Sequence, residues 1–200
     1  IPVSFTASDP SGIKEAGLRL WHGDYRAADG VEPTWVECLP VNDTTVNCTG
    51  SVEIPDVHWT FGSNALAGTW QAGVWATAKD GSFRDRPNAG SMVIRRNSAL
   101  TADATPEPAR LGSTITVTGT LLRANWDTAT YQPYASQSVQ LQRARSGTYD
   151  YLLVGSIRTD AAGVAKGYPA AGYDASYRFY WPGDASSSPV HSVGDFVDVQ

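Results

Sequence analysis

Short stretches in which hydrophobic and polar residues alternate recur along the whole chain. Ile115, Val117 and Leu121 alternate with threonines, and Val3 and Phe5 alternate with serine and threonine in the same way. Alternation with a period of two, bounded by glycine, proline, aspartate and asparagine, predicts half-buried β-strands. The first part of the chain has predicted strands at about residues 2–8, 16–22, 34–39, 45–53, 57–61, 69–79 and 91–96. The second part has them at about residues 101–105, 113–122, 137–145, 150–159, 163–169, 175–181 and 193–200.

A change in composition between residues 95 and 108 divides the predicted strands into two groups. Arg95 and Arg96 are followed there by small residues and by Pro106 and Pro108, which is typical of a short connection between domains. Many short strands with turn signals every ~8–12 residues are typical of β-sandwiches. The sequence therefore predicts an all-β protein of two consecutive sandwiches, residues 1–97 and 98–200.

The composition excludes several classes of function. Fifteen Lys and Arg against twenty Asp and Glu give a net charge of −5, and neither half is basic, so no nucleic-acid partner is expected. No apolar run approaches the ~18–20 residues of a membrane span, so no membrane insertion is expected. Seven Trp and nine Tyr against a single Met favour a strand-rich, aromatic-rich fold.

The only two cysteines, Cys38 and Cys48, lie symmetrically about Asp43. Residues 42–44, Asn-Asp-Thr, are typical of a turn. A hairpin folded there would bring the two cysteines opposite each other and within reach of a disulfide. Two cysteines without nearby histidines do not make a tetrahedral zinc site. The sequence therefore predicts a hairpin disulfide, which indicates a secreted, extracellular protein.

Two segments of the first part resemble bacterial immunoglobulin-like repeats. They are residues 3–13, Val-Ser-Phe-Thr-Ala-Ser-Asp-Pro-Ser-Gly-Ile, and residues 75–81, Trp-Ala-Thr-Ala-Lys-Asp-Gly. In such repeats one strand ends in Asp-x-Ser-Gly-Ile and a later one in Ala-x-Asp-x-x-Gly, although here the usual Gly-Asn after the second Asp is missing. The resemblance implies an immunoglobulin-like sandwich with a further strand before Ile1.

The second part resembles a domain of secreted actinobacterial proteins. The likeness lies in residues 111–119, 122–127, 137–142 and 194–199. Arginine far outnumbers lysine, and Ala, Gly and Asp are abundant, which is typical of a Streptomyces-like proteome. The resemblance implies a second immunoglobulin-like sandwich, and hence a fold of two consecutive immunoglobulin-like β-sandwiches. Some relatives carry a calcium-binding label, and modules of this kind bind, space or assemble more often than they catalyse.

Calcium is therefore a candidate cofactor of the first part. An immunoglobulin-like fold would place the turns at Asp9 and Asp80 at the same end of the sandwich. Their carboxylates, with Asp85 and backbone carbonyls, could supply the oxygen ligands that Ca²⁺ requires. The alternative is that Asp9 and Asp80 cap their own turns by accepting backbone N–H bonds.

An exposed aromatic surface is the main candidate binding site. In the strands around residues 16–22 and 69–79 the alternation turns the aliphatic side chains inward, so that Arg19, Trp21 and Trp75 point outward. In the strand around residues 34–39, Val36 and Cys38 share one side, which leaves Trp35 on the other side. If these strands are neighbours, the three Trp line one exposed face, and such a face marks a contact surface. The alternatives are an error in the register and cover by the segment 22–32.

A long loop in the second part, residues 123–134, is a further candidate for recognition. It contains Trp126, Tyr131 and Tyr134 together with polar amides, and binding residues are often carried by loops. The alternative is that the aromatic rings pin this loop onto the sandwich. Tyr177, Phe179 and Trp181 alternate with polar neighbours in a predicted strand and are assigned to the core.

The sequence contains no catalytic motif of a known kind. His22, His58 and His191 are far apart, and there is no Gly-x-Ser-x-Gly, His-Glu-x-x-His or phosphate-binding loop. We therefore expect a secreted, non-catalytic binding or structural protein that contacts an extracellular protein or a cell-wall or polysaccharide surface. Two alternatives remain open: a polysaccharide-binding accessory module, and a proteinaceous inhibitor of an extracellular hydrolase that inserts the hairpin at residues 39–47.

Overall fold

The computed structural model of the chain describes residues 2–51 and 62–200. The chain forms two compact units, Ile1–Ile94 and Arg95–Gln200, and the two units are described separately below. The strand predicted at residues 57–61, and His58 with it, lie outside the described residues.

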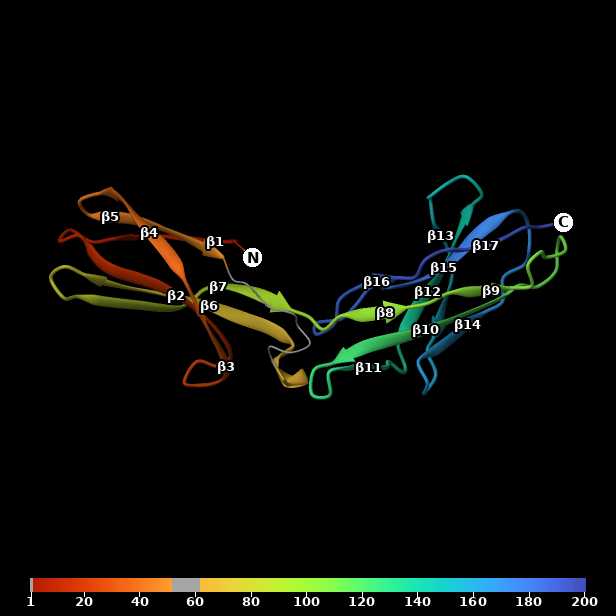
Figure 1. The fold of residues 1–200 in the computed structure, drawn as a ribbon, viewed down its shortest axis with the longest axis horizontal. Coiled ribbons are helices and arrows are strands. Elements are labelled where there is room, and N and C mark those ends of the chain that lie inside the picture. The colour runs from red at the N-terminus through yellow and green to blue at the C-terminus, as the bar shows by residue number, and fades with distance from the viewer. Residues whose placement is uncertain (1, 52–61) are drawn as a thin grey trace. The chain divides into compact units, whose positions relative to one another are not determined.

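The first unit is a sandwich of two antiparallel sheets (Figure 1). Its strands are β1 (Pro2–Ser8), β2 (Ile13–Asp24), β3 (Ala27–Thr34), β4 (Val36–Asn42), β5 (Thr45–Ser51), β6 (Gly68–Ala78) and β7 (Phe83–Ile94), and a short 3-10 helix (Asn64–Leu66) precedes β6. One sheet has the strand order β1-β5-β4 and the other the order β3-β2-β6-β7. These orders match the B-E-D and C′-C-F-G arrangements of an immunoglobulin-like sandwich.

Large apolar side chains on β2 and β6 form the centre of the first core. Leu18 lies opposite Val74, and Leu20 lies opposite Ala72 in the antiparallel register. Leu20 is fully buried and Leu18 almost so, which confirms the prediction that both point inward. Trp70 on β6 is also fully buried, and its indole N–H donates to the carbonyl of Leu66 at 2.8 Å. The two sheets of this unit therefore enclose an apolar centre.

A disulfide closes the hairpin of β4 and β5. Cys38 lies directly opposite Cys48 in the register, and the two cysteines are bonded, with their Cα atoms 3.9 Å apart. At the turn, the side-chain oxygen of Asn42 accepts a hydrogen bond from the backbone N–H of Thr44 at 3.0 Å. The predicted hairpin disulfide is confirmed.

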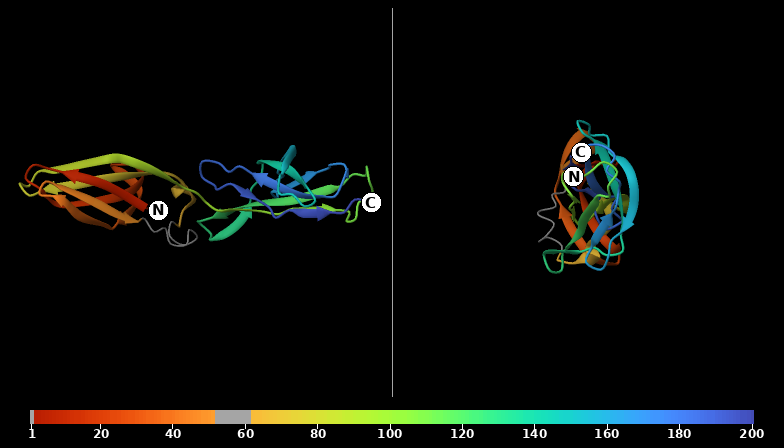
Figure 2. Two further views of the ribbon diagram at one scale, coloured as in Figure 1. Left: turned by 90° about the horizontal axis from the view of Figure 1, so that it is seen from above. Right: turned by 90° about the vertical axis from the view of Figure 1, so that its right-hand side faces the viewer.

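The second unit is also built from antiparallel sheets (Figure 2). Its strands are β8 (Ser98–Leu100), β9 (Asp103–Thr105), β10 (Thr116–Asn125), β11 (Thr130–Pro133), β12 (Ser138–Arg145), β13 (Leu152–Arg158), β14 (Val164–Gly167), β15 (Ala175–Trp181), β16 (Val190–His191) and β17 (Asp195–Val197). One sheet has β10 at its centre, paired with β8, β9, β11 and β14. The other has the order β13-β12-β15-β16, with β17 also paired with β15.

The core of the second unit follows the alternation of its sequence. Tyr177, Phe179 and Trp181 on β15 are buried, as predicted. Val117 and Leu121 on β10 are fully buried in the same cluster. The fold predicted from the sequence, two consecutive immunoglobulin-like sandwiches, is therefore the fold of the chain.

Two segments expected to be loops are strands. The segment 22–32 was expected to be a loop, yet β3 (Ala27–Thr34), which contains Pro33, pairs with β2 along its length. Proline is tolerated there because β3 is an edge strand. Part of the expected loop 123–134 likewise folds back as β11 onto the end of β10. These segments form strands because a neighbouring strand supplies their backbone hydrogen bonds, and their own residues do not indicate that neighbour.

Candidate functional site

Several aromatic residues of the first unit meet on the outer surface of the sheet β3-β2-β6-β7. In the register, Gly17 lies opposite Trp75 and Trp21 opposite Gln71, and residues that are directly opposite share a face of the sheet. Because Leu18 and Leu20 point into the core, Trp21 and Trp75 project from the other side. We call this surface the aromatic face; its residues are Arg19, Trp21, Tyr25, Trp75, Phe83 and Asp85.

Trp21 is not accessible on the aromatic face, contrary to expectation. Its side chain is only 6% exposed. The ring of Tyr25 packs edge-on against it, with ring centroids 5.2 Å apart, and the indole N–H donates to the carbonyl of Pro87 at 3.2 Å. The residues after β2 therefore cover Trp21, as the alternative interpretation held.

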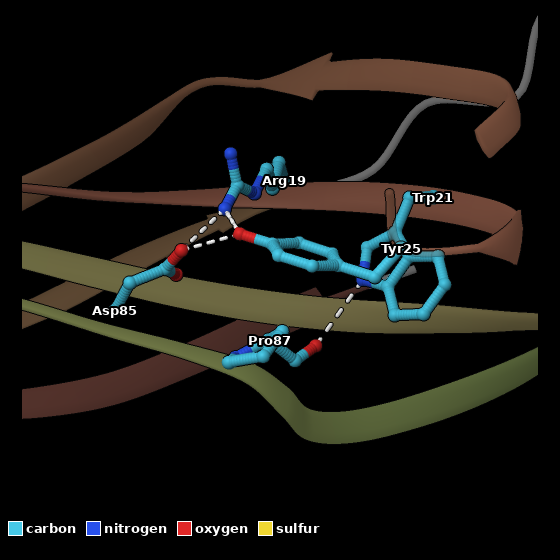
Figure 3. A network of polar contacts seen from close by, with 5 residues as sticks. All are labelled: Arg19, Trp21, Tyr25, Asp85 and Pro87. Atoms are coloured by element: carbon cyan, nitrogen blue, oxygen red, sulfur yellow. Dashed lines mark hydrogen bonds and ion pairs between the residues drawn. The ribbon is translucent and has the colours of Figure 1, made fainter. Parts of the chain in front are cut away.

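Two charged side chains, Arg19 and Asp85, fix the position of Tyr25 (Figure 3). The Arg19 guanidinium forms an ion pair with Asp85, with Nη2 and Oδ2 2.6 Å apart. Arg19 also donates to the Tyr25 hydroxyl, which in turn donates to Asp85. The guanidinium lies 4.9 Å from the centre of the tyrosine ring. Arg19, Tyr25 and Asp85 thus form one network that joins β2, the β2–β3 turn and β7.

Trp75 provides the accessible indole of the aromatic face. Its ring lies against the backbone of Gly17, where an added Cβ would be 2.6 Å from the ring atoms. The Phe83 ring lies 6.5 Å away and is 56% exposed. Trp75 is half-buried. The accessible part of the face therefore consists of an indole and a phenyl ring beside a charged network.

Trp35 lies in the connection between the two sheets, and its expected place beside Trp21 and Trp75 is wrong. It lies between the end of β3 and the start of β4, where the chain passes from one sheet to the other. The neighbour of β2 is β3 and not the strand that contains Val36. Trp35 is 91% exposed, and its backbone carbonyl lies against Gly50 of β5.

The aromatic residues of the loop in the second unit separate into two groups. Trp126 is 2% exposed and so does not offer a contact surface, as expected for a ring that pins the loop. Tyr131 is 41% exposed. Tyr134 packs edge-on against Trp181, with ring centroids 5.3 Å apart, and the Arg123 guanidinium lies 3.8 Å from the centre of its ring. Only Tyr131 of the three presents much of its surface.

Tyr134 also makes a charged hydrogen bond. Its hydroxyl donates to the Asp184 carboxylate at 2.5 Å. Burial and this hydrogen bond raise the pKa of Tyr134. Burial opposes ionisation of Asp184, but hydrogen bonds from Tyr134 and from the backbone of Ser186 outweigh it and lower the pKa of that carboxyl. This cluster stabilises the loop and leaves Asp184 charged.

The three candidate calcium ligands are engaged in other contacts. Asp9 accepts hydrogen bonds from the backbone and hydroxyl of Ser11, at 2.9 and 2.7 Å, and Asp80 accepts from the backbone of Ser82 at 2.9 Å. The two turns are adjacent, because Ser11 Oγ accepts from the Asp80 N–H at 3.3 Å. Asp85 is held by Arg19. Within residues 2–51 and 62–200 there is no group of three acidic, His or Cys side chains placed to hold a metal ion.

The sequence prediction missed Tyr25 and Phe83, which complete the aromatic face. Tyr25 follows β2 in a turn where Asp24 accepts a hydrogen bond from the Arg26 N–H at 2.8 Å. The pair Gly23-Asp24 is the signal for that turn. Phe83 lies opposite Thr77, so it shares the outward side of Trp75. This position follows from the Asp80-Gly81 turn once β6 and β7 are known to pair.

Comparison with known proteins gives distant structural neighbours. No model of a known protein family matches the chain, and no curated protein matches it. The fibronectin(III)-like modules of Clostridium thermocellum CbhA align over 99% of this chain and 84% of theirs, with 15% identity and a TM-score of 0.35. Domains A168–A170 of titin align over 100% of this chain and 59% of theirs, with 13% identity and a TM-score of 0.34. The ectodomain of the teleost fish polymeric Ig receptor aligns over 100% of this chain and 91% of its own, with 14% identity and a TM-score of 0.28.

At these TM-scores the assignment of the fold rests on the strand pairing described above. The chain spans 59% of the titin structure that it matches. Among the described residues, no helical segment has the length and hydrophobicity of a membrane-spanning helix.

Proposed function

We propose that the chain is an extracellular, non-catalytic binding protein whose first unit contacts a partner protein through the aromatic face. The observation that carries this proposal is the pairing of Trp75 and Phe83, 6.5 Å apart, beside the Arg19–Asp85 ion pair. Trp, Tyr and Arg are over-represented among the residues that dominate the free energy of protein binding. A fixed charge pair next to accessible rings also suits recognition of a polar partner surface.

Two further observations support this proposal. The Cys38–Cys48 disulfide is typical of proteins in oxidising compartments. The network that holds Tyr25 keeps the face in one conformation before binding, and a preorganised surface loses less conformational entropy when it binds.

The test is affinity capture from the medium of the cells that produce the protein, with the Phe83→Ala variant as the probe of the face. Phe83 is 56% exposed, so its removal should leave the fold intact. We expect the wild type to capture a protein and Phe83→Ala to lose it. Tyr149, which is 94% exposed in the second unit, gives the matched control Tyr149→Ala, which should still capture it. Equal capture by all three forms contradicts the proposal.

A glycan partner is the main alternative outcome of this test. Retention of the wild type on an insoluble polysaccharide, lost in Trp75→Ala and kept in Tyr149→Ala, would assign the face to carbohydrate. Exposed indole rings are suited to stacking on sugars, and ligand sites are rich in aromatic side chains.

The hairpin of β4 and β5 supports a second candidate function, inhibition of an extracellular hydrolase. Leu39 and Val41 are 58% and 56% exposed on this hairpin, and the Cys38–Cys48 disulfide braces it. Such a rigid, apolar hairpin could enter an active site. A stoichiometric loss of protease activity that Leu39→Ser weakens and Phe83→Ala leaves unchanged would favour this function over the first.

A further inference from the structure

The strand β13 lies at the edge of one sheet of the second unit and carries apolar side chains that are exposed there. Among the described strands it pairs with β12 alone. Three consecutive residues of it are exposed: Leu152 by 69%, Leu153 by 61% and Val154 by 40%. Soluble proteins rarely place apolar side chains in a row on an exposed edge, because such edges associate. We call these three residues the apolar edge.

A β-bulge explains why three residues in a row are exposed. In the ladder with β12, Gly155 lies opposite Leu141 and Leu153 lies opposite Gln142, so Val154 is the extra residue. A bulge breaks the alternation of side chains and bends the strand. It also interrupts the row of free backbone groups, which disfavours an endless edge-to-edge ladder. The apolar edge is therefore suited to a contact made by side chains.

The other half of β13 is packed within its own unit. Ile157 packs against the core of the second unit, and a Cβ added at Gly167 of β14 would lie 3.4 Å from the Ile157 side chain. Leu152 and Leu153, near the start of the strand, are more than half exposed. The exposed apolar surface of β13 is thus confined to one part of the strand.

The residues that flank this apolar segment carry opposite charges. Asp150 precedes β13 and Arg158 is its last residue, and residues 151–157 between them are uncharged. Both charged side chains are exposed. Arg158 Nε donates to the carbonyl of Ser136 at 3.1 Å, and within the described residues neither Asp150 nor Arg158 forms an ion pair. Val154 is the midpoint between the two charges along the chain.

The order of these charges indicates which partner fits the apolar edge. A complementary strand that runs antiparallel to β13 has a basic group beside Asp150, then an apolar segment, then an acidic group beside Arg158. The β13 strand of a second copy, turned about a two-fold axis near Val154, presents these groups in this order. A two-fold arrangement uses the same surface on both copies, as most dimers of identical chains do.

We propose that two copies of the chain associate through the apolar edge, with their β13 strands antiparallel about a two-fold axis near Val154. Leu152 and Leu153 of one copy pack against the apolar edge of the other, and Asp150 of each copy lies beside Arg158 of the other. These ion pairs are at the exposed rim, so they set the direction of pairing and add little to its free energy. The apolar edge shares no residue with the aromatic face, so this proposal does not depend on the proposed function.

Sedimentation equilibrium of the full chain, from micromolar to millimolar concentration, tests the association. The average mass should rise reversibly from 21.4 kDa toward twice that value. Leu153→Lys changes an exposed side chain and should weaken the dimer at least tenfold, because it places a charge from each copy at the apolar contact. Leu111→Lys, at a position that is 69% exposed and outside the apolar edge, is the matched control and should dimerise as the wild type does. Phe83→Ala should dimerise as the wild type does as well.

Reversal of the flanking charges tests the direction of pairing. Asp150→Arg alone should weaken the dimer about threefold, because an arginine then faces Arg158 at both ends of the contact. Addition of Arg158→Asp should restore the wild-type affinity, because each pair again has opposite charges. A single-chain mass up to millimolar concentration, growth beyond two copies, or equal dimerisation of Leu153→Lys and the wild type would overturn the proposal. A double reversal that fails to restore the affinity would overturn it too.

Discussion

Arg19 on β2 and Asp85 on β7 form an ion pair, 2.6 Å between Nη2 and Oδ2, across the strand that separates them. The residue of β6 opposite Arg19 is Gly73, which has no side chain to block the crossing. The pair is partly exposed, with side-chain exposures of 37% and 25%, so its own contribution to stability is small. Its structural consequence is larger, because it holds the Tyr25 hydroxyl and places the tyrosine ring over Trp21.

Tyr25→Ala should uncover Trp21. Without the tyrosine ring, the indole that is now 6% exposed would face water, and loss of the edge-on pair should cost about 1 kcal/mol of stability. We expect a red shift of tryptophan emission and stronger quenching by acrylamide. Tyr149→Ala, at a position 94% exposed in the second unit, should change neither. Unchanged emission in Tyr25→Ala would show that Trp21 has another cover.

Gly17→Ala should displace the ring of Trp75. An added Cβ would lie 2.6 Å from the ring, too close for two carbon atoms, so the indole must move outward. Such crowding costs about 1–2 kcal/mol of stability and should change the emission of Trp75. The matched control is Gly155→Ala on β13, where an added Cβ meets nothing within 4 Å. There we expect no loss, and a gain of up to about 1 kcal/mol because alanine restricts the unfolded chain. Equal stability of the two variants would contradict this packing.

Removal of the disulfide should destabilise the first unit alone. The bond closes a short loop, since Cys38 and Cys48 are 10 positions apart, and loop-closure entropy assigns such a bond about 3 kcal/mol. In the double variant Cys38→Ala with Cys48→Ala, calorimetry should show a lower melting temperature for one transition. The other transition, from the second unit with its own core, should stay in place and serves as the internal control. A shift of both transitions would mean that the units do not unfold independently.

The alternation of side chains was sufficient to predict which residues face the cores. Leu18, Leu20 and Phe179 are buried because strands place every second side chain on one side. The disulfide was predicted because Cys38 and Cys48 lie at equal distances along the chain from turn-forming residues. These features depend on local sequence, and the structure agrees with them.

The candidate site could be predicted only in part, because it depends on which strands are neighbours. The outward direction of Trp21 was derived from β2, but its burial depends on Tyr25 and Pro87, which lie in other segments. Trp35 was placed beside Trp21 because its strand was taken as a neighbour of β2, whereas β3, rich in turn residues, is that neighbour. Nothing in a single strand indicates which segment covers it or pairs with it.

Tyr134→Phe should raise the pKa of Asp184. Burial favours the neutral carboxyl, but the hydrogen bonds from the Tyr134 hydroxyl and from Ser186 hold the pKa below its ordinary value near 3.8. Phenylalanine keeps the ring packed on Trp181 and removes only the hydroxyl. A carbon NMR titration of the Asp184 carboxyl should therefore show a higher pKa in Tyr134→Phe, and no change in the control Tyr149→Phe.

The same hydrogen bonds make the stability of the second unit depend on pH in a definite direction. Because the folded-state pKa of Asp184 lies below its unfolded value, the stabilisation is complete above about pH 4 and is lost as the pH falls through the folded pKa. Urea unfolding of the second unit between about pH 5 and pH 2 should show this loss. Asp184→Asn never ionises, so its stability should vary less over that range, while Asp150→Asn in an exposed segment should behave as the wild type. An Asp184→Asn curve as steep as that of the wild type would show that other carboxylates cause the acid sensitivity.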